Sequence, residues 1–351
     1  MQLNICVDGI IEMLQKNGGI TVYFYELLKR LSLNNDIKLH YLSYNDHGNI
    51  SRMLGGLVTD DNHVAISRRT AKVLERYRSV DVKIKDAIFH STYYRLPSYR
   101  NKKIVTTVHD FTYEKYRSGV ARRVHCAQKY RAIRASDHVI CVSQNTANDL
   151  QRYCPISPER ISVVYNGVSE SYKPLSSMRN HQPRSVVFVG SRGGYKNFDK
   201  VVLALRNDPE LSLVIVGGGP LNPLEKAFLV TNIGERYRYL SYLTDDELNA
   251  EYNSALCLAY PSEYEGFGIP IVESMKAGCP VVAIGKSSIP EVAGDSAILL
   301  KNAEHGSILD AIQSLKSDEI RGDYVQRGLQ QSFKFSWDKT YKETAKVYAE
   351  L

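Results

Sequence analysis

The sequence predicts an α/β protein with two doubly wound parallel-sheet domains that face each other across a cleft. Its 351 residues exceed the roughly 250 that one hydrophobic core usually holds. Short apolar runs alternate with longer segments of helical periodicity, as in parallel sheets covered by helices. The alternation lapses once, in a polar stretch with two prolines, and then begins again. We therefore expect a first domain over residues 1–170, a linker over 171–184 and a second domain over 185–335.

The first half contains five apolar runs of strand length and two segments with the period of a helix. The expected strands are LNICVD (3–8), IKLHYLS (37–43), AIFHST (87–92), KIVTTVHD (103–110) and HVICVS (138–143). The expected helices are GGITVYFYELLKRLS (18–32) and QNTANDLQRYC (144–154). Strands separated by helices predict a parallel sheet.

A second series follows the polar stretch. Its expected strands are SVVFVGS (185–191), LSLVIVGGGP (211–220, ending in a turn), RYRYLSYL (236–243), ALCLAYPS (255–262) and PVVAIG (280–285). Its expected helices are KNFDKVVLALRN (196–207) and an amphipathic segment at the C-terminus. Ligands of doubly wound sheets bind at the carboxyl ends of the strands, so the residues that follow the strands are the candidates for function.

Composition indicates a soluble globular enzyme, with 43% hydrophobic and 24% charged residues. No apolar run reaches the roughly 18 residues that a membrane helix needs. The start, MQLNICVDGI, lacks the basic region and long apolar core of a secretory signal. Six separated cysteines without a C-x-x-C pair indicate buried thiols in a reducing compartment, and we expect a cytoplasmic protein.

Positive charge is concentrated in the first half. The whole chain carries +7, residues 1–175 carry +10, and the remainder carries −3. The stretch KYRSGVARRVHCAQKYRAIR (115–134) holds seven basic residues and no acidic one. It predicts either a solvated helix face or a surface that docks on an anionic membrane or a phosphate-bearing acceptor. No aromatic-plus-glycine RNA signature is present, so no nucleic-acid partner is expected.

Two acids bracket a glycine-rich turn in PSEYEGFGIPIVESMKAGCP. Pro270 suits the first turn of a helix, where its missing N–H costs nothing, and Gly278 suits the end of that helix. Glu265 is then expected in the turn before a short helix. Glu273 is expected in the first or second turn of the helix itself.

Backbone amides at the start of this helix predict an anion or hydroxyl site. They are those of Phe267, Gly268 and Ile269. Gly266 and Gly268 would let a ligand approach the backbone closely. Alternatively, Glu273 only offsets the helix dipole, which is worth roughly 0.3–1 kcal/mol. That alternative leaves Glu265 and the glycines unexplained.

The segment EGFGIPIVE has an E-x7-E pattern and resembles the family 4 retaining glycosyltransferases, which have the GT-B fold of two Rossmann-like domains. Seven more stretches match this family in order: NGGITVYFYELLKRL (17–31), FHSTYYRLP (89–97), VTTVHDFTY (105–113), VICVSQNTANDL (139–150), VVYNGVSESYKP (163–174), FVGSRGGYKNFDKVV (188–202) and SIPEVAGDSAILL (288–300). The resemblance covers essentially the whole chain. The opening helix also resembles bacterial O-antigen and polysaccharide mannosyltransferases.

The resemblance implies that Arg192 and Lys196 bind the donor diphosphate through their positive charges. They follow an expected strand and are four residues apart, so a helical turn would place both on one side. Two cations would offset the charge that builds on the leaving nucleotide. The alternative is a solvated loop pair. Gly190 and Gly218 are expected beside the nucleotide.

Further contacts with the donor are implied elsewhere in the chain. Gly18 and Gly19 would bring helix N-terminal amides to the phosphates, or they merely form a turn. Glu273 is expected to accept hydrogen bonds from the ribose, and Glu265 from the donor sugar near the reacting carbon. His109 would contact the transferred sugar, although a histidine at a strand end is often structural.

One departure from the family lies just after the glycine pair. Relatives often carry a basic residue there, whereas this chain has Thr21 and Val22. We therefore assign no phosphate or acceptor contact to these two positions.

The resemblance implies a retaining hexosyltransferase with Glu265, His109, Arg192 and Lys196 as catalytic residues. The donor would be a nucleotide diphosphate sugar, with GDP-mannose slightly favoured over a UDP-hexose. The acceptor would be a hydroxyl of a glycan or lipid-linked oligosaccharide in bacterial surface polysaccharide synthesis, met at the inner face of the cytoplasmic membrane. No Asp-x-Asp motif stands in a suitable place, so neither a metal nor a cofactor is expected.

Two alternatives remain, a nucleotide-sugar epimerase of the GT-B fold and a catalytically silent nucleotide-sugar-binding subunit. The resemblance also implies that the C-terminal helix, 336–351, returns to the first domain and places Trp337 against it.

Overall fold

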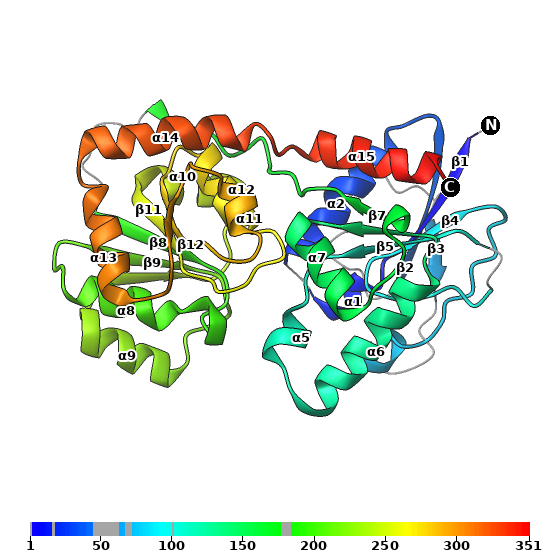
Figure 1. Cartoon of the computed structure of the whole chain (residues 1–351), viewed down its shortest axis with the longest axis horizontal. Coiled ribbons are helices and arrows are strands. Elements are labelled where there is room, and N and C mark those ends of the chain that lie inside the picture. Colours follow the sequence, from blue (N-terminus) through cyan, green and yellow to red (C-terminus); the bar gives the residue numbers. More distant parts are fainter. Residues whose placement is uncertain (1, 16–17, 45–62, 67–71, 100–101, 177–183) are drawn as a thin grey trace. The chain divides into compact units, whose positions relative to one another are not determined.

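The computed structural model describes residues 2–15, 18–44, 63–66, 72–99, 102–176 and 184–351 (Figure 1). The chain forms two compact units. The first comprises Met1–Gly167 and Trp337–Leu351, and the second comprises Val168–Ser336. In the described ranges, no helix has the length and apolar character needed to cross a membrane.

The first unit is built on a parallel sheet with the strand order β3-β2-β1-β4-β5-β6-β7. Its strands are β1 (Leu3–Asp8), β2 (Ile37–Tyr44), β3 (His63–Ile66), β4 (Ile88–Ser91), β5 (Ile104–Val108), β6 (His138–Cys141) and β7 (Ile161–Val163). The direction in which strands are added reverses between β1 and β4, which is the switch point of a doubly wound sheet.

Helices cover the first sheet, and the last of them comes from the C-terminus. They are α1 (Ile11–Leu14), α2 (Gly19–Ser32), α4 (Lys72–Glu75), α5 (Thr112–Tyr116), α6 (Gly119–Ala135), α7 (Gln144–Tyr153), the 3₁₀ turn η1 (Pro158–Arg160) and α15 (Trp337–Ala349). Helix α15 packs beside α2 (Figure 1). Trp337, Val347 and Tyr348 of α15 share a buried core with Tyr23 and Phe24 of α2.

The second unit has a six-stranded parallel sheet with the order β10-β9-β8-β11-β12-β13. Its strands are β8 (Ser185–Val189), β9 (Ser212–Val216), β10 (Tyr237–Leu240), β11 (Ala255–Tyr260), β12 (Val281–Ile284) and β13 (Ile298–Leu300). The switch point lies between β8 and β11.

Helices lie on both faces of this second sheet. They are the 3₁₀ turn η3 (Gly194–Lys196), α8 (Phe198–Arg206), α9 (Pro223–Ile233), α10 (Asp245–Ser254), α11 (Ile269–Lys276), α12 (Ile289–Ala293), α13 (His305–Ser314) and α14 (Asp318–Ser332). Helices α8, α9 and α13 share one core with the sheet. Helix α11 packs against α10, α12 and α14.

The predicted fold class, α/β with two doubly wound parallel sheets, is confirmed. The sequence did not predict β3 and β7, which are edge strands of only four and three residues. Of the expected linker, residues 171–176 belong to the second unit, and 177–183 lie outside the described residues. All six cysteines are buried and free of disulfides.

Candidate active site

The carboxyl edge of the second sheet gathers most of the predicted site residues. Strands β8 and β11 are neighbours at the switch point. The loop after β8 carries Gly190, Arg192 and Lys196, and the loop after β11 carries Glu265 and the glycine turn. Ligands of doubly wound sheets bind in this position.

Lys196 and Glu265 form an ion pair that joins the two loops. Their side chains are 12% and 13% exposed, so the pair is mostly buried but keeps some contact with solvent. The ammonium group lies 5.4 Å from the ring centre of Tyr260 and 5.5 Å from that of Tyr195. Backbone bonds fasten the loops further, since the Glu263 amide donates to the Tyr195 carbonyl at 2.9 Å.

Arg192 is directed elsewhere and is only 3% exposed. Its Nε donates to Oε1 of Glu225 at 2.9 Å, and its Nη1 donates to the Gly217 carbonyl at 2.8 Å. Its Nη2 reaches the carbonyls of Gly219 and Pro220 at 2.8 and 3.1 Å. The two cations therefore bind different elements, and Arg192 holds the β9–α9 glycine turn as well as lying at the predicted site.

Only glycine fits at Gly218. Its φ is +73°, and a Cβ there would lie 2.4 Å from the Gly190 carbonyl oxygen and 2.7 Å from Nη1 of Arg192. The glycine turn after β9 therefore packs against the backbone at the end of β8. Because glycines have no side chain, backbone atoms line this part of the sheet edge.

The turn before α11 is held by two serines that sequence reasoning missed. Ser287 donates to the Glu265 carbonyl at 2.6 Å and accepts from the Glu265 amide at 3.2 Å. Ser288 donates to the carbonyls of Glu265 and Phe267 at 3.0 and 2.9 Å. Both serines belong to the β12–α12 loop, more than twenty residues after Glu265. A local sequence pattern cannot predict contacts between residues so far apart.

Helix α11 begins as the sequence predicted. Gly268 is its N-cap residue, with φ of +101°, and no side chain caps the helix. Ile269 and Pro270 open its first turn. Its first amides are therefore not occupied by a capping side chain.

Glu273 lies one turn further along α11 and is partly buried. Its Oε2 accepts a hydrogen bond from the Tyr252 hydroxyl at 3.3 Å. Burial, reinforced by the charge of Asp245, raises the pKa of Glu273 to about 7, although hydrogen bonds from Tyr252 and Tyr172 oppose the rise. Tyr260 is close enough to both acids of the E-x7-E pattern for each to raise its pKa, after burial itself.

His109 belongs to the first unit, directly after β5. Its ring meets those of Tyr23 and Phe24 edge-on, at centre distances of 5.1 and 6.1 Å. Burial lowers the pKa of His109 to about 4, so the imidazole is neutral at pH 7. Its Nε2 is buried and has no hydrogen-bond partner among the described residues.

The strand end that carries His109 is anchored by a buried lysine. Lys129 of α6 donates to the Asp110 carbonyl at 3.0 Å and to Oε2 of Glu114 at 2.8 Å. Its ammonium also lies 4.3 Å from the ring centre of Phe111. Sequence reasoning assigned Lys129 only to a basic stretch, because its pairing with Glu114 depends on the packing of α6.

The remaining predicted residues of the first unit lie at the start of α2. Gly18 is the N-cap residue and Gly19 the first residue of the helix. Thr21 is buried and accepts a hydrogen bond from Gln15 at 3.0 Å, whereas Val22 is 41% exposed. Gly18, Gly19 and His109 are thus the predicted site residues that belong to the first unit. All the other predicted site residues belong to the second unit.

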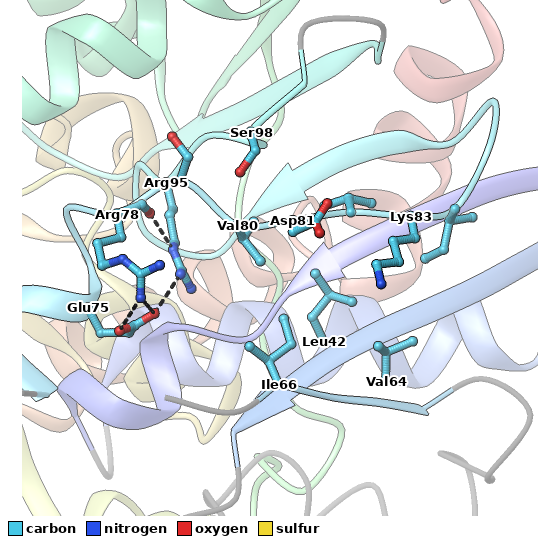
Figure 2. Close-up of a pocket in the computed structure, with 13 residues that line it drawn as sticks. Leu42, Val64, Ile66, Glu75, Arg78, Val80, Asp81, Lys83, Arg95 and Ser98 are labelled. Carbon is cyan, nitrogen blue, oxygen red and sulfur yellow. Dashed lines mark hydrogen bonds and ion pairs between the residues drawn. The ribbon is translucent and has the colours of Figure 1, made fainter. Parts of the chain in front are cut away.

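A cavity of about 460 Å³ also lies in the first unit (Figure 2). Figure 2 shows two arginines of its wall paired with Glu75, Arg95 at 3.0 Å and Arg78 at 3.3 Å. Arg95 also lies 3.5 Å from Asp8. None of the predicted site residues lines this cavity, and we treat its paired charges as part of the framework of the unit.

The two sheets, each with its switch point, define an α/β protein of two doubly wound units. The sequence matches the model for glycosyltransferase family 4 over residues 17–172 and the model for glycosyl transferases group 1 over 175–331. The chain therefore belongs to the family 4, GT-B glycosyltransferases, as its motifs predicted, and is a glycosyltransferase.

Similar proteins agree with this assignment. The chain is 27% identical to O-antigen chain mannosyltransferase B of Escherichia coli over 94% of this chain and 95% of that protein. It is 25% identical to the O-antigen chain mannosyltransferase RfbU of Salmonella typhimurium over 64% of each. The solved structure of Anabaena HepE in complex with UDP-glucose has the same fold, with a TM-score of 0.75 at 17% identity over the full length of both chains.

Proposed function

We propose that this protein is a retaining hexosyltransferase of bacterial surface polysaccharide synthesis. It moves a hexose from a nucleotide diphosphate sugar to a hydroxyl of a glycan or lipid-linked oligosaccharide. The observation that carries the proposal is the ion pair of Lys196 and Glu265 at the switch point of the second sheet, with Tyr260 close to this pair and to Glu273. Arg192 lies on the same loop as Lys196 and binds Glu225 and the glycine turn. The Escherichia coli relative is named a mannosyltransferase, which supports mannose as the transferred hexose, and we keep GDP-mannose as the favoured donor with a UDP-hexose as the next choice.

In this proposal the donor diphosphate lies between the two loops that Lys196 and Glu265 join. The phosphates compete with Glu265 for the Lys196 ammonium group and with Glu225 for the Arg192 guanidinium group. On donor binding, each cation therefore exchanges a carboxylate for a phosphate. The uncapped amides of α11 and the glycine backbone at Gly190 and Gly218 supply further donors. Gly18 and Gly19 offer amides from the first unit.

The two acids bind hydroxyl groups of the donor. Glu265 holds the hexose near the reacting carbon, and Glu273 holds the ribose. His109 acts as a neutral imidazole and hydrogen-bonds the transferred hexose through the buried Nε2. Glu265 is paired with a lysine, which favours a binding role for this carboxylate over a nucleophilic one.

The reaction proceeds on one face of the hexose. The acceptor oxygen forms a bond to the anomeric carbon as the bond from that carbon to the diphosphate oxygen breaks. The acceptor proton passes to the departing phosphate, and the configuration is retained. Lys196 and Arg192 offset the charge on the leaving diphosphate, so the step needs no metal ion and no cofactor. Full activity in excess EDTA is the expected result, and dependence on added Mg²⁺ or Mn²⁺ would contradict it.

A donor screen tests the proposal first. GDP-, UDP- and dTDP-sugars are compared by thermal shift, and a donor at 100 times its Kd adds about 2.7 kcal/mol of stability. The best donor is then incubated with and without glycan acceptors. Transfer requires an acceptor. Conversion of the donor alone into another nucleotide sugar would indicate an epimerase, and binding without turnover would indicate a silent subunit.

Retention is tested on the product. We expect NMR to show an α-linked product from an α-linked donor. A β-linked product would contradict the retaining mechanism while leaving the transferase activity intact.

We further propose that the first unit meets an anionic membrane through the corner between α5 and α6. This corner patch consists of Tyr116, Arg117, Val120, Arg122, Arg123 and Val124, all exposed. Val120 is 73% exposed, and Tyr116 and Val124 are 42% and 41% exposed. Apolar tips flanked by arginines suit a surface of anionic headgroups over an acyl interior.

Vesicle binding tests the corner patch. The double variant Arg122→Glu/Arg123→Glu should lose binding to vesicles that contain anionic lipid, and wild-type binding should weaken as salt rises. Lys342→Glu/Lys346→Glu, on the exposed side of α15, has the same change in charge and should still bind. Equal loss in both variants, or salt-independent binding by the wild type, would contradict a specific patch.

A further inference from the structure

Glu273 lies among the hydroxyl groups of two tyrosines and the carboxyl group of Asp245. The proposed hydrogen bond between Glu273 and a ribose would not by itself need these groups. Tyr252 of α10 donates to Oε2 of Glu273 at 3.3 Å. Tyr172, on the segment that enters the second unit, donates to Oδ1 of Asp245 at 3.4 Å and is close enough to Glu273 for the two groups to shift each other's pKa. The two tyrosines are 0% and 2% exposed, so their hydroxyl groups are held by the core.

The tyrosine of the entering segment is fixed in place by its neighbours. The Lys173 amide donates to Asn249 at 3.0 Å, and the Leu175 amide donates to Asn253 at 2.7 Å. Asn253 donates back to the Lys173 carbonyl at 3.0 Å. These hydrogen bonds hold the backbone of the segment in place, so Tyr172 cannot move together with Glu273. Its hydroxyl group is therefore a donor of fixed position near two carboxylates.

One phenol proton beside two carboxylates cannot satisfy both of them. If Glu273 and Asp245 are both ionised, the Tyr172 hydroxyl donates to one and the other loses that bond. The two negative charges also repel each other, since the charge of Asp245 raises the pKa of Glu273. A ribose hydroxyl that donates to Glu273 favours its ionised form, so nucleotide binding and proton release at this carboxylate are linked.

We propose that Tyr252 and Tyr172 are positioning residues that orient the Glu273 carboxylate, and that Asp245, which accepts a hydrogen bond from the Tyr172 hydroxyl, opposes the ionisation of Glu273, so that nucleotide binding is linked to proton release. This inference rests on the proposed function, in which Glu273 contacts the donor. Tyr252 fixes Oε2, which leaves Oε1 for the ligand. The pKa of Glu273, raised to about 7 by burial and then by Asp245, agrees with this arrangement.

The groups around Glu273 are few and come from four places. Tyr252 and Asp245 belong to α10, Tyr172 to the entering segment, and Tyr260 to β11. On α11 itself, Lys276 is paired with Glu170 at 2.7 Å. Among the described residues, Asp245 is the charged group whose effect on the Glu273 pKa follows that of burial, so this residue is the one to change.

The binding experiment measures the affinity of GDP and UDP for the whole chain between pH 5.5 and 8.5 by calorimetry. Wild-type affinity for the better nucleotide should rise with pH through about 7. Asp245→Asn should move the inflection down by about one pH unit, so that affinity at pH 6 increases by up to about tenfold. Tyr252→Phe and Tyr172→Phe should move it upwards. Asp246→Asn, in the same helical turn, should match the wild type.

Glu273→Gln separates the failure of this inference from the failure of the proposed function. If Glu273→Gln binds as tightly as the wild type with the same pH dependence, Glu273 is no nucleotide contact and the proposed function loses that assignment. If Glu273→Gln is weak and independent of pH while Asp245→Asn and both phenylalanine variants follow the wild-type curve, the positioning inference is overturned.

Thermal stability without nucleotide gives an independent measurement. A carboxyl group whose pKa is raised on folding takes up a proton, so its contribution to stability falls as pH rises from about 4.5 through 7. Asp245→Asn should make this fall smaller, and Tyr252→Phe should make it larger. Identical pH profiles in all three proteins would overturn the inference even if no nucleotide bound.

Discussion

The two units share the order of six strands, to which the first unit adds β7 at one edge, but their switch points carry different chemistry. In the first unit, Asp8 ends β1 as a fully buried carboxylate, beside Arg95 and under the Tyr44 hydroxyl at 3.0 Å. In the second unit, β8 ends in a glycine loop with the partly exposed pair of Lys196 and Glu265. Nine of the ten described glycines with positive φ belong to the second unit. One edge is filled by fully buried paired charges, whereas the other carries a glycine-rich backbone and a partly exposed ion pair.

The units also differ in how they respond to pH. In the first, burial lowers the pKa of His90, and of His125 with help from Lys129, to about 3. In the second, burial raises the pKa of Glu273 to about 7. Acid should therefore destabilise the first unit through its buried histidines, although burial also raises the pKa of Asp8 there to about 6, which opposes this effect. In the second unit, protonation of Glu273 should relieve the repulsion from Asp245.

The largest effect should come from removing the C-terminal helix. Deletion of residues 336–351 exposes the core that Trp337 and Tyr348 share with α2, and breaks the 2.6 Å contact between Tyr348 and His90. We expect a loss of several kcal/mol confined to the first unit, since single large-to-small core changes already cost 2–5 kcal/mol. Hydrogen exchange read separately for peptides of each sheet measures this. Equal protection in both units before and after deletion would contradict it.

Lys196→Ala should lower turnover by about 10²-fold or more, because it removes a preorganised charge from the leaving diphosphate. Lys200→Ala, on the exposed surface of α8, is the matched control and should keep wild-type turnover. Steady-state rates with the best donor decide the matter. Near-wild-type turnover in Lys196→Ala would remove this residue from the site.

Arg192→Ala should combine a similar loss of turnover with a lower melting temperature, because it also releases the glycine turn. A variant that is inactive but as stable as the wild type would mean that the hydrogen bonds to the turn contribute little.

Gly218→Ala should cost about 1–3 kcal/mol, since its positive φ and the contact with the Gly190 carbonyl both forbid a side chain. Donor affinity should fall with it. Gly322→Ala, within α14 and facing open space, should instead stabilise by about 0.5–1 kcal/mol. Chemical denaturation measures both. Equal effects of the two substitutions would contradict the special role of the glycine turn.

The smallest expected effect is an opposite pH dependence of the two units between pH 7.5 and 5. Folded His90 stays neutral, so the unfolded chain binds more protons below pH 6.5 and the first unit loses stability there. Glu273 acts with the opposite sign in the second unit. The single tryptophan, Trp337, reports the first unit by fluorescence, and hydrogen exchange at β8 and β11 reports the second. Parallel changes in both units would contradict this.

Most strands of both sheets could be predicted because burial on both faces leaves a continuous apolar run in the sequence. The short edge strands β3 and β7 lack this signal, since three or four residues at an edge carry little periodicity. The turn before α11 was also predictable, because proline and glycine mark helix ends locally.

The sequence by itself determined the fold class, the family and the positions of Arg192, Lys196, Glu265 and Glu273, because these follow from local patterns and their order along the chain. Only the tertiary structure decided the partners: Arg192 with the glycine turn, Lys196 with Glu265, and Glu273 with two tyrosines. Such pairs join residues far apart in the chain. Their hydrogen bonds depend on distances that the packing of helices against a sheet sets, and no pattern of residues encodes those distances locally.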